Sequence, residues 1–195
     1  MRSRYPDLLV PRVAAGESVA TSPSIIAAAD RSQAVLLSVN LLGYVVQAYP
    51  GWAGFRDGFL EHWERLADLV SIQRANRVAL RYVNRFAGPL ATAVRRLDRP
   101  AFLVPLSPSV HWYEGSTRMT THRGHAAHVQ VRYEADGGAE AAVVLDLDVA
   151  REGLDDLTAM SDTLEALHGD VEALFLESIE PQFANSLAAV PEEAR

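Results

Sequence analysis

The chain has 195 residues, 49% of them hydrophobic, and a formal net charge of −7, which is a globular composition and argues against nucleic acid as the partner. It contains no cysteine, which excludes disulfides, thiolate catalysis and thiolate metal ligands. No run approaches the roughly twenty apolar residues of a membrane helix, and the first residues lack the apolar core of a secretory signal, so we expect a cytoplasmic protein without membrane partners.

The first half of the chain predicts an arm, a strand, a helix and a second strand. Prolines and a glycine break up residues 1–30, which predicts a loosely structured N-terminal arm. Ala34–Asn40 is rich in Val and Leu and predicts a strand that ends in a turn or bulge. Apolar residues at steps of three and four predict a helix over 51–69. The strand expected over Ser71–Phe86 completes a strand–helix–strand unit.

The second half predicts a strand meander followed by a long helix. Three β-type runs separated by glycine-containing turns cover Val110–Thr121, Ala126–Ala135 and Ala141–Ala150. The apolar stripe from residue 157 predicts a helix over 157–188, before a tail over 191–195. The sequence therefore predicts one α+β domain over 31–190, with a mainly antiparallel sheet and both helices on one of its faces.

The most informative stretch is Arg77–Phe86, an alternating strand with arginines on one face. Side chains alternate between the two faces of a strand, so Arg77, Arg81 and Arg85 share a side. A row of guanidiniums must be solvated, paired with carboxylates, or directed at an anion. This row is the strongest functional signal in the sequence.

A second alternating strand, Val143–Ala150, supplies carboxylates for this row. Asp146 and Asp148 share one of its faces, and as neighbours of the arginine strand they would pair with Arg81 and Arg85 for roughly 0.2–1 kcal/mol each. The alternative is that the arginines and aspartates together bind a ligand or a partner. Three arginines face two aspartates, so we expect one guanidinium, Arg77 or Arg81, to be left for a bound anion or a partner's carboxylate.

Histidines and one tyrosine give weaker candidates. His122, His125 and His128 follow one another at steps of three and could bind a metal ion. Their spacing spans a turn, so we expect exposed histidines and neither a metal nor another cofactor. His168 in the C-terminal helix and Tyr82 in the arginine strand are candidate acid/base residues. A histidine at the edge of the core is the preferred interpretation of His168.

Several short pieces, taken in order, resemble a sporadically distributed bacterial family without an assigned function. The pieces are Ser38–Tyr44, Trp52–Phe55, Trp63, Arg77–Arg85, Leu145–Asp148, Leu167–His168 and Phe175–Glu177. The resemblance covers residues 33–188 and implies the same strands and helices. It implies no activity and no catalytic residues.

Two classes of function fit these observations. The first is a non-catalytic binding or accessory protein that engages a protein or peptide through the arginine face, a sheet edge or the C-terminal helix, which could also form a homodimer seam. The alternative is a cofactor-independent cyclase, isomerase or lyase of specialised metabolism, with a cavity between the sheet and the C-terminal helix. The absence of a recognisable catalytic motif favours the first.

Overall fold

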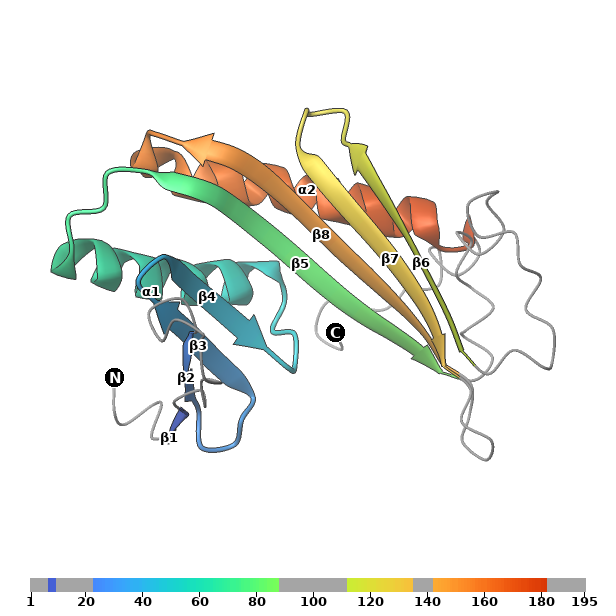
Figure 1. The fold of residues 1–195 in the computed structure, drawn as a ribbon, viewed down its shortest axis with the longest axis horizontal. Helices are drawn as coiled ribbons and strands as arrows, with labels where there is room; N and C mark the ends of the chain where they lie inside the picture. The colour runs from blue at the N-terminus through green and yellow to red at the C-terminus, as the bar shows by residue number, and fades with distance from the viewer. Residues whose placement is uncertain (1–6, 10–22, 88–111, 135–141, 182–195) are drawn as a thin grey trace, which may run out of the picture. The chain divides into compact units, whose positions relative to one another are not determined.

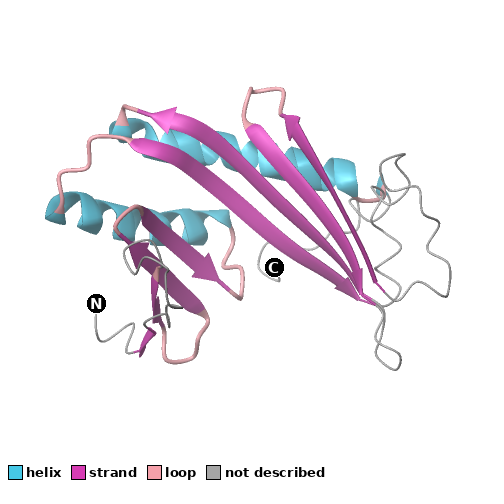
Figure 2. Ribbon diagram, in the orientation of Figure 1, coloured by secondary structure: helices cyan, strands magenta, loops and turns pink. Residues whose placement is uncertain are grey.

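The computed structural model describes residues 7–9, 23–87, 112–134 and 142–181 of the chain (Figure 1). The chain divides after Ile72 into two compact units, and each unit contains an antiparallel four-stranded sheet and a long helix (Figure 2). The predicted α+β class and the antiparallel pairing are confirmed. The strands form two sheets, however, and the boundary at Ile72 falls inside the domain predicted over 31–190.

The first unit is a meander of short strands followed by a helix. Its strands lie in the order β1-β2-β3-β4. They are β1 (Asp7–Leu9), β2 (Ser24–Ala27), β3 (Gln33–Ser38) and β4 (Leu41–Val46), and helix α1 spans Trp52–Leu69. Both β1 and β2 lie within the arm predicted over residues 1–30, so part of that arm belongs to the sheet. The sequence pattern missed β4, because Gly43 interrupts its apolar run.

Tyr44 connects this first sheet to α1. Its ring lies 5.5 Å from Phe55 and 5.4 Å from His62, measured between centroids. Its hydroxyl donates to Oε1 of Gln33 at 2.7 Å. A Cβ built on Gly58 of α1 would lie 2.7 Å from the same hydroxyl oxygen. The tyrosine therefore packs directly against the backbone of α1 at Gly58, where a larger residue would collide with it.

Replacing Gly58 with alanine is expected to destabilise the first unit, although the same change inside an exposed helix gains about 1 kcal/mol. The new methyl group would displace Tyr44 and break its hydrogen bond to Gln33. Urea denaturation followed by tryptophan fluorescence measures the effect. If Gly58→Ala raises the free energy of unfolding, the close approach of Tyr44 to α1 is wrong.

The second unit contains the longer strands and the larger core. Its strands lie in the order β5-β8-β7-β6. They are β5 (Ala75–Ala87), β6 (Trp112–Thr120), β7 (Ala126–Glu134) and β8 (Ala142–Leu154), followed by a 3-10 turn over Leu157–Ala159 and helix α2 over Met160–Ser178. The helix predicted over 157–188 begins with a 3-10 turn and ends earlier than predicted, at Ser178, because Ile179 is extended. Residues 182–188 and the tail over 191–195 lie outside the described residues.

Helix α2 covers one face of this second sheet, where it contacts β5 and β8, and it runs behind the sheet in Figure 1. Most of the buried side chains in this interface are apolar, and Leu145, Leu147 and Leu167 have no exposed surface at all. The predicted placement of both helices on one sheet is wrong, because α1 contacts β4 whereas α2 contacts β5 and β8. Helix α2 buries its apolar stripe in its own unit, whereas the aromatic residues of the α1 stripe are only half-buried.

Candidate functional site

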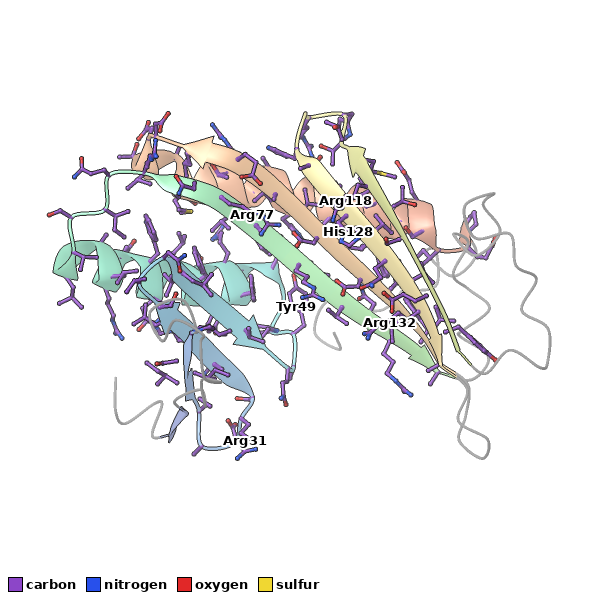
Figure 3. All side chains as sticks on the ribbon, in the orientation of Figure 1. Arg31, Tyr49, Arg77, Arg118, His128 and Arg132 are labelled. Carbon is purple, nitrogen blue, oxygen red and sulfur yellow. The ribbon has the colours of Figure 1, made fainter. Side chains whose placement is uncertain are left out.

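The face of the second sheet opposite α2 is polar, and we call it the open face. Directly paired residues of neighbouring strands point to the same side of a sheet, so the register defines the rows of this face. Taken in the strand order β5, β8, β7, β6, three successive rows are Arg81–Asp148–His128–Arg118, Val83–Asp146–Gln130–Ser116 and Arg85–Val144–Arg132–Glu114. Arg77 extends the face along β5, and Figure 3 labels it together with Arg118, His128 and Arg132.

Two arginines of β5 form ion pairs with the aspartates of β8. Arg81 binds Asp146 with both ends of its guanidinium, with Nε 2.8 Å from Oδ1 and Nη2 2.5 Å from Oδ2. Asp146 is only 4% exposed, and its hydrogen bond raises the pKa of Arg81 despite partial burial. Arg77 contacts Asp148 at 2.8 Å and Glu152 at 3.5 Å. The aspartates therefore neutralise Arg81 and Arg77.

The arginines of the open face that lack a partner among the described residues are not the ones that the sequence predicted. Arg85, Arg118 and Arg132 make no hydrogen bond or ion pair with any residue that the structure describes. Arg132 is the most confined of the three, since its Nε is buried and has no acceptor among the described residues. Glu114, its partner in the register, accepts a hydrogen bond from Gln130 instead. Arg77 and Arg81, the predicted spare guanidiniums, are both paired.

The three histidines of the predicted loop do not converge. His122 is exposed in the turn between β6 and β7, and His128 lies on the open face. His125 points the other way, and its Nδ1 lies 2.7 Å from Oδ2 of Asp170. Within the described ranges, no group of three or more histidine and acidic side chains is arranged to hold a metal ion.

The sequence did not single out Asp170, which fixes the β6–β7 turn to α2. Its carboxylate is 1% exposed and accepts hydrogen bonds from Thr121 at 2.6 Å, from Arg123 at 2.7 Å and from His125. Burial by itself would raise the pKa of Asp170, but these hydrogen bonds and the charge of Arg123 together lower it. A signal was present, because Asp170 falls between Leu167 and Leu174 on the apolar stripe of the helix.

Tyr82 and His168, the two predicted acid/base candidates, lie beside each other on the α2 side of the sheet. The Tyr82 hydroxyl is 3.5 Å from Nδ1 of His168, and the ring centroids are 6.2 Å apart. Burial lowers the pKa of His168, while the carboxylates of Glu172 and Glu165 oppose this effect. His168 is therefore held mainly as the neutral imidazole at neutral pH.

Replacing Glu172 with glutamine is expected to lower the pKa of His168 further. Two carboxylates raise this pKa, and the change removes the one with the larger effect. The folded state holds this histidine in its neutral form. The free energy of unfolding therefore falls as the pH drops below about 6.5, the pKa of a histidine in the unfolded chain. NMR titration of the imidazole protons measures the pKa of His168 in the wild-type chain and in the variant. A pKa that stays constant or rises in Glu172→Gln would show that burial and these carboxylates do not set it.

No protein-family model, curated protein or solved structure matches this chain. The resemblance to a bacterial family therefore stays a prediction. Among the described residues, no helix is long and apolar enough to cross a membrane.

Proposed function

We propose that this chain is a binding protein that holds an acidic segment of a partner protein on the open face of the β5-β8-β7-β6 sheet. The observation that carries the proposal is the set of three arginines, Arg85, Arg118 and Arg132, without a partner among the described residues. They come from three different strands of one sheet, so their backbone positions are fixed before any partner arrives.

Electrostatics favours a carboxylate-rich partner. The chain as a whole is acidic, yet unpaired cations gather on this one face. A buried N–H without an acceptor costs about 1–3 kcal/mol, and Nε of Arg132 is such a donor within the part of the chain that the structure describes. A carboxylate that accepts from Arg132 would remove this cost and could bind the guanidinium through two parallel hydrogen bonds. Binding is therefore expected to weaken with added salt.

Charge reversal at Arg85 and Arg132 tests the proposal. In the double variant Arg85→Glu, Arg132→Glu, we expect affinity for a fluorescently labelled polyglutamate peptide to fall by at least about tenfold, which corresponds to about 1.4 kcal/mol. Fluorescence anisotropy at low ionic strength measures this affinity. The paired arginines Arg77 and Arg81 are left intact so that the sheet keeps its internal ion pairs.

The matched control carries Arg31→Glu and Arg65→Glu in the first unit. Both residues are exposed, and the control has the same net charge as the test variant. If the control loses as much affinity as the test variant, the effect comes from net charge and the proposed face is wrong. Equal binding by the test variant and the wild-type chain would overturn the proposal as well.

The alternative function, a cofactor-independent enzyme, is favoured by one arrangement on the other side of the sheet. Tyr82 and His168 are adjacent, and the nearby Asn84 has a buried side-chain nitrogen with no hydrogen-bond partner in the described ranges. Native mass spectrometry of the protein, after incubation with a small-molecule extract, distinguishes the two functions. A retained molecule that is lost in Tyr82→Phe and in His168→Gln would support the enzyme, whereas retention unaffected by both changes would count against it.

A further inference from the structure

A pocket lies at the end of the second sheet, where the strands differ in length. β7 begins at Ala126, opposite Ala150, while β8 continues to Leu154 with β5 as its partner. The β6–β7 turn folds beside this continuation and leaves a pocket of about 430 Å³. Its lining residues are Arg123, Gly124, His125, Ala126, Ala150, Arg151 and Glu152.

Contacts outside the pocket hold its polar side chains in place. Asp170 binds Arg123 and His125 from α2, and Arg151 donates to the hydroxyl of the buried Thr163 at 3.3 Å. With Nδ1 of His125 bound to a carboxylate, the imidazole ring has a fixed orientation and its Nε2 points away from Asp170. The side chain of His125 is 13% exposed, so it lines the pocket as a largely buried group.

Hydrogen-bond donors outnumber acceptors in this pocket. A guanidinium has five N–H donors, and each of Arg123 and Arg151 uses one of them in the contacts above. Glu152 is the only acidic side chain among the described lining residues, and its Oε1 lies 3.5 Å from Nε of Arg77 on the open face. The remaining donors match a ligand that carries several acceptor oxygens.

We infer that this pocket binds a small oxyanion, a phosphate group either free or as a phosphomonoester. Arg123 and Arg151 would supply N–H donors to the anion, and the Nε2 edge of the His125 ring, which points away from Asp170, would lie against it. The donors of this site differ from Arg85, Arg118 and Arg132 of the open face, because they come from the β6–β7 turn and from Arg151 of β8. It needs no partner protein.

Titration with sodium phosphate at constant ionic strength tests the inference. The imidazole resonances of His125 are expected to shift and to saturate, and Arg151→Gln should weaken the apparent affinity by about tenfold. Glycerol phosphate in the same buffer distinguishes the sources, since a site built for a monoester binds it more tightly than free phosphate. The open-face variant Arg85→Gln should leave the titration unchanged, which separates this site from the proposed function.

A second variant displaces Arg123 and keeps the side chain of Asp170, although the Arg123–Asp170 ion pair is weakened. A Cβ added at Gly169 would lie 2.9 Å from Nη1 of Arg123, so Gly169→Ala should move that guanidinium and weaken phosphate binding while the helix stays folded. The inference is overturned if His125 shifts do not saturate, if chloride produces the same shifts, or if Arg151→Gln and Gly169→Ala both bind phosphate as the wild-type chain does.

Discussion

Replacing Asp170 with alanine is expected to lower the free energy of unfolding by about 3 kcal/mol. Removing one member of a buried ion pair typically costs about 3–5 kcal/mol, and Asp170 also accepts a hydrogen bond from Thr121. We place the effect at the lower end, because Arg123 is 46% exposed and water can solvate it after the change. The β6–β7 turn would lose its attachment to α2.

Urea denaturation of the Asp170→Ala chain measures this loss, with Glu172→Ala as the control. Glu172 is an exposed acid on the same helix, and its removal should change stability by no more than about 0.5 kcal/mol. The pKa of Asp170 is lowered in the fold, so its contribution is present at neutral pH and disappears only as the pH falls through that lowered value. Equal losses from both variants would contradict the role assigned to Asp170.

Replacing Arg81 with glutamine is expected to cost about 2 kcal/mol, since it leaves the buried carboxylate of Asp146 without its charged partner. Asp146→Asn should cost less, because the side chain of Arg81 is 61% exposed and can be solvated. The double variant should resemble Asp146→Asn. A double-mutant cycle from urea denaturation should then give a coupling energy of at least about 1 kcal/mol.

The exposed pair Glu61–Arg65 on α1 is the matched control for this cycle. Its atoms are as close, 2.7 Å, but its side chains are 38% and 50% exposed. Helical pairs of this kind contribute about 0.3–0.5 kcal/mol. A coupling energy for Arg81 and Asp146 no larger than that of the control would mean that burial of the aspartate does not strengthen the pair.

Local patterns predicted most of the second unit correctly. Strict alternation located β5 and gave the shared face of Arg77, Arg81 and Arg85, and the 3–4 spacing located α2. The pairing of Arg81 with Asp146 also agrees with expectation. These features depend on the period of side chains along one strand or helix, which the sequence records directly.

Features that depend on register and on tertiary contact could not be predicted. The arginines pair with aspartates diagonally across β5 and β8, so Asp148 binds Arg77, and Arg85 is the arginine of β5 left without a described partner. Arg118 lies on β6 and Arg132 on β7, and both share the face of Arg85 because of the register in which these strands pair. That register cannot be derived from the sequence of one strand. The contact of His125 with Asp170 joins residues far apart in the chain. The spacing of the histidines identified His125 only as one of three candidates in a loop.

The central claim is that the open face of the β5-β8-β7-β6 sheet binds an acidic partner, and NMR mapping tests it most directly. Polyglutamate peptide is added to isotope-labelled protein, and the N–H signals of the backbone and of the arginine side chains are followed. We predict that the largest saturating shifts belong to the Nε–H groups of Arg85, Arg118 and Arg132, and that salt reverses them. Saturating shifts confined to α1 or to the exposed side of α2, with these three arginines unaffected, would contradict the claim.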